Sequence, residues 1–232
     1  MGMFKELEYS SISVKDLLGR TLNDVEIKYA PKILHIAGPM EIPLPRPRVS
    51  IIGSRKASTK GLEAAQTITK TLAENKTVIV SGLAEGIDTA AHKAAIATGG
   101  KTVAVIGTPL NKVYPQKNFE LQEEIMNNHL VISQFSIGHP TTPKDFVLRN
   151  RTMALISDAT IIVEAGDTSG SLHQGWEALR LGRPLFIWKS IFSNTKLIWP
   201  EKMLQYGAME LSDPWDMFEI LPSHLEILDV FQ

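Results

Sequence analysis

The sequence predicts a doubly wound α/β fold with a mostly parallel sheet. Short apolar, β-branched runs recur along the chain, and segments long enough to form helices lie between them. These runs do not alternate apolar with polar residues, so each strand is expected to be covered on both faces. Strands that alternate with helices favour parallel pairing through right-handed crossovers. With 232 residues, 44% of them hydrophobic, the chain can bury one such core.

A central strand–helix–strand unit is predicted over residues 78–107. Its first strand, over 77–80, is followed by a glycine-containing turn, an alanine-rich helix over 88–98 and a second strand over 102–106. The turn over 81–86 therefore lies at the carboxyl end of a central strand. In open parallel sheets, ligands bind at that edge.

The residues before this unit predict an extension and a connector. Residues 1–38 are expected to form a short N-terminal extension with one strand, over 32–36, after a short helix over 14–18. Four prolines within residues 39–47 exclude both helix and central strand. We therefore expect an extended, proline-rich connector over 39–48.

The main domain is predicted over residues 49–210, and residues 211–232 are expected to pack on it as a C-terminal tail. At least five strands alternate with helices in this domain. Besides the central unit, strands are expected at 49–52, 130–132, 160–163 and 184–187, and helices at 59–74, at 119–127, from 146 onwards and at 171–181.

Composition excludes several classes of protein. There is no cysteine, so neither disulfides nor thiolate metal sites are possible. A formal net charge of −1 gives no global attraction to nucleic acid, so any such binding needs a local patch. No apolar run reaches the roughly 20 residues of a membrane helix, and the N-terminus lacks an apolar signal core. We therefore expect a soluble cytoplasmic protein without membrane contact.

A first candidate anion site follows the strand over 49–52. Gly53, Ser54 and Arg55 come directly after that strand, and the helix over 59–74 follows them. The unpaired N–H groups of a helix N-terminus converge at such a turn and attract anions. Arg55 adds a planar guanidinium suited to phosphate. The dinucleotide motif G-x-G-x-x-G is absent, and we expect no cofactor.

One polar pair and one glutamate favour structural roles over chemistry. Asp88 and His92 are one helical turn apart, but two ligands without a third do not make a zinc site. We expect Asp88 to N-cap its helix, with His92 as a neighbouring polar contact. Glu164, at the end of its strand, is expected to hold a loop or an arginine. No metal site is predicted.

Several blocks of the sequence resemble the DprA/Smf family of DNA-processing proteins. They are GSR at 53–55, SGLAEGIDTAAHKAAI at 81–96, AVIGTPLNKVYP at 104–115, FVLRNRTMALIS at 146–157, IIVEAGDTSGSL at 161–172, Asn194 with Leu197-Ile198, and Tyr206-Gly207-Ala208. The match extends over roughly residues 30–210 in the family's order and spacing. After Gly207-Ala208 the chain ends within 25 residues, so we expect a Rossmann-like core without a winged-helix tail.

The resemblance implies a fold, a ligand and partners. The fold is an extended Rossmann-like domain of the type shared by DprA and "lonely guy" proteins. The implied function is binding of single-stranded DNA and assistance in loading a RecA-type recombinase during DNA uptake and recombination. The resemblance also implies a homodimer and no enzymatic activity.

The helix from residue 146 onwards supplies further candidates for the same site. Phe146 offers a face for base stacking, an interaction of roughly 1–3 kcal/mol. Arg149 and Arg151 flank Asn150, and only one of the two arginines needs to face the ligand. The alternative is that Phe146 packs in the core and the arginines form structural ion pairs.

The predicted nucleic-acid site combines these residues with two glycine-containing turns. Hydroxyl and N–H groups of the turn at 169–171 are suited to phosphate contacts. The complete expected set is Gly53, Ser54, Arg55, Gly82, Phe146, Arg149, Asn150, Arg151, Ser169, Gly170 and Ser171.

Two other functions use the same scaffold. Phosphoribohydrolases of the "lonely guy" type use an arginine and a glutamate in a G-G-x-G-T-x-x-E loop. Here Gln174 stands where that glutamate would be, and an amide cannot replace a catalytic carboxylate. Glu177, one helical turn later, is the remaining candidate for that role. A sensor of a nucleotide derivative is the third hypothesis.

Overall fold

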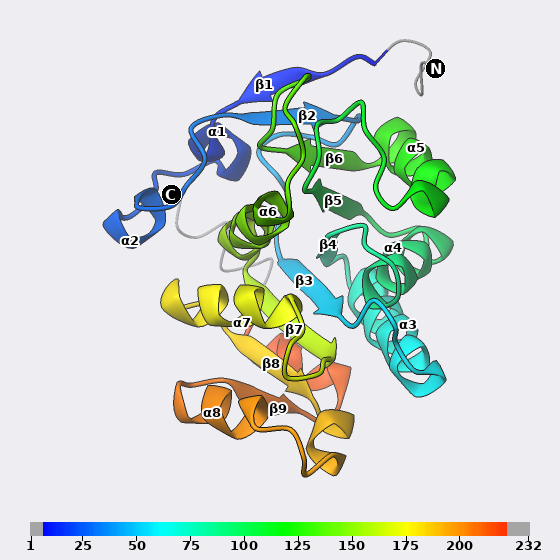
Figure 1. Cartoon of the computed structure of the whole chain (residues 1–232), viewed down its shortest axis with the longest axis vertical. Coiled ribbons are helices and arrows are strands. Elements are labelled where there is room, and N and C mark those ends of the chain that lie inside the picture. The colour runs from blue at the N-terminus through cyan, green and yellow to red at the C-terminus, as the bar shows by residue number, and fades with distance from the viewer. Residues whose placement is uncertain (1–6, 222–232) are drawn as a thin grey trace.

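The computed structural model of the protein describes residues 7–221. Within them, one nine-stranded sheet runs in the order β1-β2-β6-β5-β4-β3-β7-β8-β9 (Figure 1). The strands are β1 (Ser10–Ile12), β2 (Leu34–Ala37), β3 (Arg48–Gly53), β4 (Val78–Ser81), β5 (Thr102–Ile106), β6 (Leu130–Ser133), β7 (Ala159–Glu164), β8 (Leu185–Trp188) and β9 (Met209–Leu211). In this spatial order, the seven strands that begin with β6 and end with β9 are parallel to one another, whereas β1 and β2 add antiparallel pairing at one edge.

Helices cover both faces of the sheet, as predicted for a doubly wound fold. They are α1 (Val14–Leu18), α2 (Asp24–Ile27), α3 (Thr59–Glu74), α4 (Ile87–Ala97), α5 (Phe119–Asn128), α6 (Pro143–Ile156), α7 (Ser171–Arg180) and α8 (Trp199–Gln205), with short 3-10 turns at Gln116–Asn118, Lys189–Ser193 and Pro214–Glu219. Side chains of α3, α4 and α5 pack on one face, and those of α1, α6, α7 and α8 pack on the other.

The strands are buried on both faces because their apolar residues alternate between the two helical layers. In β4, Val78 and Val80 join the cluster that includes α6, whereas Ile79 joins the cluster of α3 and α4. All three are at most 1% exposed. A run of consecutive β-branched residues therefore contributes side chains to the hydrophobic cores on both faces of the sheet.

The order of the strands reverses between β3 and β7. From β3 the chain winds through β4 and β5 to β6, and α6 then returns it to β7, on the other side of β3. From β7 the chain continues outward through β8 to β9. In sheets of this kind, a crevice opens beyond the carboxyl ends of the strands at the point of reversal.

The predicted extension contains two strands where one was expected. β1 was missed because two of its three residues are exposed serines that give no apolar pattern. At the opposite edge, β9 was missed as well, because it is three residues long and Glu210 interrupts it. The described part of the C-terminal tail packs on α3 through Leu211, Met217 and Leu221. Residues 222–232 lie outside the described range, and the predicted segment boundaries stay predictions.

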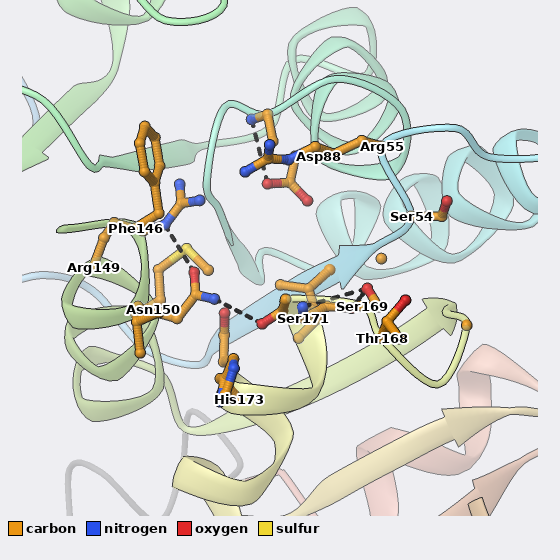
Figure 2. Close-up of a pocket in the computed structure, with 18 of the residues that line it drawn as sticks. Ser54, Arg55, Asp88, Phe146, Arg149, Asn150, Thr168, Ser169, Ser171 and His173 are labelled. Carbon is orange, nitrogen blue, oxygen red and sulfur yellow. Dashed lines mark hydrogen bonds between the residues drawn. The ribbon is translucent and has the colours of Figure 1, made fainter. Parts of the chain in front are cut away.

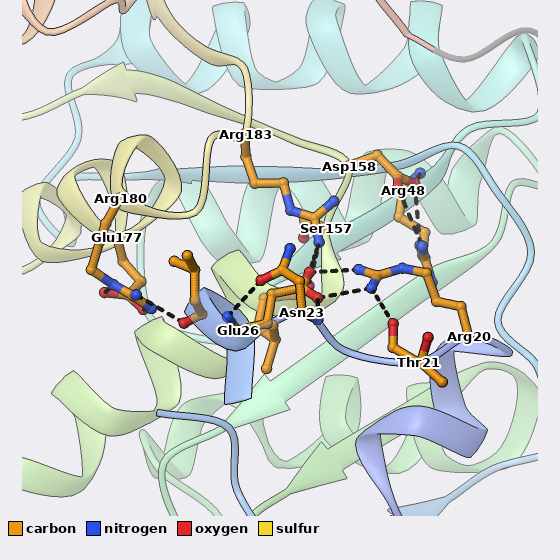
Figure 3. Close-up of polar contacts among 12 residues, drawn as sticks. Arg20, Thr21, Asn23, Glu26, Arg48, Ser157, Asp158, Glu177, Arg180 and Arg183 are labelled. Carbon is orange, nitrogen blue, oxygen red and sulfur yellow. Dashed lines mark hydrogen bonds and ion pairs between the residues drawn. The ribbon is translucent and has the colours of Figure 1, made fainter. Parts of the chain in front are cut away.

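A buried ionic network lies at the amino ends of β3 and β7 (Figure 3). Arg48 and Asp158 are almost fully buried, and Nε of Arg48 lies 3.2 Å from Oδ2 of Asp158. Arg46 adds a second contact to that carboxylate at 2.8 Å. Burial raises the pKa of Asp158, but Arg48 and Arg46 outweigh this effect, so the pKa lies below its ordinary value.

The same network ties the N-terminal extension to the core. Glu26 of α2 accepts hydrogen bonds from Arg20 at 2.6 Å and from Arg183 at 2.8 Å. The hydrogen bonds from Arg20 lower the pKa of Glu26 and outweigh its burial. Arg183 stands just before β8, so this contact ties the extension to the second half of the sheet, whereas its strand β2 pairs with β6 in the first half.

Candidate nucleic-acid interface

A cavity of about 780 Å³ lies at the carboxyl ends of β3 and β7, where the strand order reverses. Its walls are the turn after β3, the first half of α6, the loop after β7 and the start of α7 (Figure 2). The cavity is as large as typical small-ligand sites. The fold therefore brings together turns that lie more than 100 residues apart in the chain.

Phe146 and Arg55 form the mouth of the cavity. The Phe146 ring is half-buried, and its centre lies 5.8 Å from the guanidinium carbon of Arg55, whose side chain is exposed. The ring of Tyr114 lies 5.1 Å from that of Phe146. A side chain at Gly107 would collide with the Phe146 ring, which explains the small residue there. Two aromatic rings and a cation thus meet at one opening.

Arg149 lies beneath Phe146 and is anchored to the sheet. Its side chain is 5% exposed. One guanidinium nitrogen, Nη1, donates to the carbonyl oxygen of Gly82, after β4, and at 2.9 Å to that of Val105 in β5. Burial lowers the pKa of Arg149 to about 10, an effect that Asp88 opposes and Arg55 reinforces. The guanidinium therefore remains charged at neutral pH.

Asp88 sits beside this guanidinium, and its predicted role as N-cap is wrong. The helix begins at Ile87, one residue before Asp88, and Gly86 occupies the cap position. The Asp88 carboxylate instead accepts hydrogen bonds from the N–H groups of Gly82 at 3.2 Å and Ala84 at 3.3 Å. Burial raises the pKa of Asp88, and the charge of Arg149 opposes this shift.

The predicted contact between His92 and Asp88 is replaced by a different one. The Nδ1 atom of His92 lies 2.7 Å from the hydroxyl of Thr102 in β5. Burial lowers the pKa of His92 to about 3, so the imidazole is neutral at neutral pH. Within residues 7–221 no group of three or more potential metal-ligating His, Asp or Glu side chains occurs.

Asn150 connects Arg149 to the loop after β7. Its Oδ1 atom accepts a hydrogen bond from Nε of Arg149 at 2.9 Å, and its Nδ2 atom donates to the carbonyl oxygen of Gly170 at 3.0 Å. The hydroxyls of Ser169 and Ser171 lie 2.6 Å apart at the start of α7. The cap residue Gly170 offers no side chain, and the first N–H groups of the helix bond within the loop instead, that of Ser171 to Oγ of Ser169 at 3.4 Å and that of Leu172 to the carbonyl oxygen of Ser169 at 3.2 Å.

Arg151 does not line the cavity, so the structure does not bring it together with the other predicted residues. Its guanidinium carbon stacks 4.7 Å from the centre of the Tyr29 ring, where Arg180 makes a similar contact at 4.8 Å. Residues two apart on a helix point about 200° away from each other, so Arg149 and Arg151 cannot share one site. Of the two arginines, Arg149 lines the cavity, whereas Arg151 contacts an aromatic ring.

The other predicted residues are brought together. Nine of the eleven line the cavity: Gly53, Ser54, Arg55, Phe146, Arg149, Asn150, Ser169, Gly170 and Ser171. Gly82 lies directly behind it, because its carbonyl holds Arg149. Sequence reasoning missed Lys56, Thr168, His173 and Gln174, which also line the cavity. The position of Lys56 next to Arg55 and that of Gln174 three residues after Ser171 were the available signals.

Comparison with known proteins shows which family the chain belongs to. The family model described as DNA recombination-mediator protein A matches residues 12–222. The chain belongs to this family. The DNA processing protein DprA of Streptococcus pneumoniae is 44% identical over 161 residues, which are 69% of this chain and 56% of that protein. The chain thus spans little more than half the length of this relative.

Two solved structures of the DprA family share the fold. That of DprA from Streptococcus pneumoniae has a TM-score of 0.76 at 33% identity and covers 96% of this chain and 77% of its own. That of DNA processing protein A from Helicobacter pylori, described for its single-stranded DNA binding mode, also has a TM-score of 0.76, at 25% identity, covering 95% and 97%. The Rossmann-like fold of the family is therefore confirmed.

Two carboxylates singled out from the sequence have structural partners. Glu164 accepts hydrogen bonds from the N–H group of Ser58 at 3.0 Å and from its hydroxyl, so it holds the start of α3, as expected. Glu177 pairs with Arg180, whose Nε lies 3.0 Å away, and does not line the cavity. No helix within residues 7–221 is long and apolar enough to cross a membrane.

Proposed function

We propose that the chain binds single-stranded DNA in the cavity at the reversal point of the sheet. In this proposal it assists loading of a RecA-type recombinase during DNA uptake and recombination, as a homodimer in the cytoplasm, and has no catalytic activity of its own. Membership of the DNA recombination-mediator family supports this proposal, as does the single-stranded DNA binding mode for which the Helicobacter pylori structure is described.

The observation that carries the proposal is the pairing of Arg55 with Phe146 at the mouth of the cavity. Exposed cations, here Arg55 and the neighbouring Lys56, neutralise phosphates without regard to sequence. Aromatic faces stack bases at roughly 1–3 kcal/mol for each base. A duplex keeps its bases stacked on one another, so the rings of Phe146 and Tyr114 favour a single strand.

The enzymatic alternative has weaker support. Hydrolysis of a glycosidic bond needs a carboxylate that can reach the reacting centre. Glu177 is held by Arg180 outside the cavity. Asp88 lines the cavity, but its carboxylate is buried and is held by the N–H groups of Gly82 and Ala84. The geometry therefore favours binding over bond cleavage.

The test compares single-stranded and duplex oligonucleotides of the same sequence over a series of salt concentrations. We expect tighter binding of the single strand and a steep loss of affinity with salt, because phosphate contacts release counterions. Equal affinity for both forms would refute the proposed site. Free nucleoside monophosphates serve as competitors and as substrates. Displacement of the strand by a nucleotide at low concentration would favour the sensor, and release of free base would favour the hydrolase.

A further inference from the structure

Three buried donor atoms near the amino ends of β3, β7 and β8 have no hydrogen-bond partner among the described residues. They are Nη1 of Arg48, Nε of Arg183 and the hydroxyl oxygen of Thr160. The side chain of Arg48 is 2% exposed, and Thr160 is 1% exposed. Buried donors in folded proteins nearly always have a partner, so three of them in one region indicate a bound group that accepts hydrogen bonds.

The register of the strands brings these three residues together on one face of the sheet. Thr160 in β7 lies beside Ser50 in β3 and beside Leu185 in β8. Arg48 stands two residues before Ser50, and Arg183 stands two residues before Leu185. Residues two apart along an extended chain share a face of the sheet. Arg183 also donates to a carbonyl oxygen of α6 at 3.2 Å, and α6 is the helix that covers this face.

The buried ionic network around these donors carries more positive than negative charge. Its ion pairs within the described residues join four guanidinium groups to two carboxylates, namely Arg20, Arg46, Arg48 and Arg183 to Glu26 and Asp158. The pKa of each carboxylate lies below its ordinary value, so both are already charged at neutral pH. Four positive charges against two negative ones leave an excess of two. A buried charge without a counter-charge is costly, so the missing partner is better an anion than a neutral water.

The charges of this network act on one another at close range. Burial lowers the pKa of Arg183, and the positive charges of Arg20 and Arg48 lower it further, whereas Glu26 and Asp158 oppose the shift. Figure 3 shows Arg48, Asp158 and Arg183 in the same cluster. An anion bound there therefore interacts with several guanidinium groups at once.

The packing around the donors favours a small anion. Ser50 and Ser157 are buried beside Thr160, and their hydroxyls bond to each other at 2.7 Å. None of the three donor residues lines the cavity at the carboxyl ends of the strands. In so closely packed an interior, a monatomic ion fits more readily than a phosphate.

We propose that the amino ends of β3, β7 and β8 bind one chloride ion, held by Nη1 of Arg48, Nε of Arg183 and the hydroxyl of Thr160. The ion neutralises part of the excess positive charge in the buried ionic network. Since Arg183 also holds Glu26 of the N-terminal extension, the ion strengthens the attachment of the extension to the sheet. This site is separate from the proposed DNA-binding cavity, which lies at the opposite ends of the strands, and does not depend on it.

The test measures thermal unfolding in sodium chloride and in sodium gluconate at the same ionic strength. Equal ionic strength keeps the screening of surface charges constant, and gluconate is too large for the buried site. An ion that binds only the folded state stabilises it by mass action, so the wild-type midpoint should be about 2–4 °C higher in chloride and should rise with chloride concentration. Equal midpoints in the two salts would overturn the proposal and assign these donors to water.

Two threonine variants separate binding at this site from a general effect of the salt. Thr160→Val removes the hydroxyl and keeps the shape of the side chain, so it should lose most of the advantage of chloride, because a methyl group then faces the ion. Thr69→Val is the matched control. The hydroxyl of Thr69 is also buried and without a partner among the described residues, but it lies on α3, which packs on the other face of the sheet. Thr69→Val should keep the full advantage, and equal chloride dependence in all three proteins would overturn the site.

A crystal of the wild-type protein grown in sodium bromide gives a readout that does not depend on how the variants fold. Bromide replaces chloride in such sites and scatters X-rays anomalously. We expect an anomalous peak within hydrogen-bond distance of Arg48 and Arg183. A water molecule at this position, or bromide bound only at surface residues, would overturn the proposal.

Discussion

The guanidinium of Arg149 occupies the space that a side chain at Gly82 would need. A Cβ atom built at Gly82 would overlap the Arg149 guanidinium and lie 2.7 Å from a carboxylate oxygen of Asp88. The carbonyl of Gly82 accepts a hydrogen bond from the same guanidinium. Only a residue without a side chain at position 82 therefore leaves room for the buried guanidinium of Arg149.

Gly82→Ala should lower the free energy of unfolding by about 1–3 kcal/mol, as overpacking does in closely packed interiors. Urea unfolding measures this loss. Gly166→Ala is the matched control, because no atom lies within 4 Å of a Cβ built there, and it should change stability by less than about 0.5 kcal/mol. Equal losses in the two variants would show that Gly82 is not packed as described.

Substitution of Arg55 and of Arg149 should have different consequences, although both were expected to contact phosphate. Arg55 is exposed, so Arg55→Ala should weaken oligonucleotide binding by about 1–3 kcal/mol and leave unfolding unchanged. Arg149 holds two carbonyl oxygens in the interior. Arg149→Ala should therefore cost about 3 kcal/mol or more of stability, since buried acceptors and Asp88 lose their partner.

Lys70→Ala is the control for charge in these binding assays. Lys70 is exposed on α3, far from the lining of the cavity, and its ion pair with Glu74 is long, at 3.8 Å. It should bind DNA like the wild-type protein. A loss of affinity for Lys70→Ala equal to that for Arg55→Ala would mean that net charge, rather than the cavity, determines binding.

Asp158→Asn should destabilise the protein at neutral pH and do so less in acid. The folded-state pKa of Asp158 lies below its ordinary value, which is about 3.9 in unfolded chains. The stabilisation is therefore complete above about pH 4 and is lost as pH falls through the folded-state pKa. Near pH 7 the variant should lose about 3–5 kcal/mol, because Arg48 remains buried without its counter-charge.

Urea unfolding at pH 7 and pH 3 checks this prediction, with Asp24→Asn as the control for an exposed carboxylate. The difference between the wild-type protein and Asp158→Asn should shrink at pH 3, whereas Asp24→Asn should resemble the wild-type protein at both values. A difference for Asp158→Asn that is constant with pH would show that packing, not charge, is lost.

The proposed homodimer is tested by sedimentation at micromolar concentration. We expect a species near twice the 25.7 kDa of one chain. Two linked cavities can engage one strand, so longer oligonucleotides should bind more tightly than the contacts of a single cavity allow. A species of single-chain mass at every concentration would contradict the prediction.

Much of the sheet was predictable because buried parallel strands leave uninterrupted apolar runs. The strand over Thr102–Ile106 and the helix over Thr59–Glu74 were placed correctly to the residue. Edge strands carry no such signal, since β1 and β9 are each three residues long and partly exposed. Helical periodicity shows which residues share a face of a helix, but not which other segment of the chain packs against that face. The contact of Arg151 with Tyr29 could therefore not be predicted.

The cavity was predicted from strand ends, and the roles of its residues were less accessible. Arg149 was expected at the ligand, but burial assigns it to the support of the cavity. Gln174 stands where a catalytic glutamate would be and was set aside because an amide cannot replace a carboxylate; that its buried amide has no hydrogen-bond partner among the described residues is evident only in the folded structure. Hydrogen-bond satisfaction is a property of the folded chain, and no local pattern encodes it.

The reversal of strand order between β3 and β7 has a consequence for synthesis of the protein. These strands are neighbours through residues such as Arg48 and Asp158, which are 110 positions apart in the chain. One wall of the cavity therefore emerges from the ribosome long before the other. A nascent chain in which α7 has not yet emerged can form the strands from β3 to β6, but it lacks the second wall of the cavity and cannot bind a ligand there. The ability to bind appears late in synthesis, when closure of this long loop is complete.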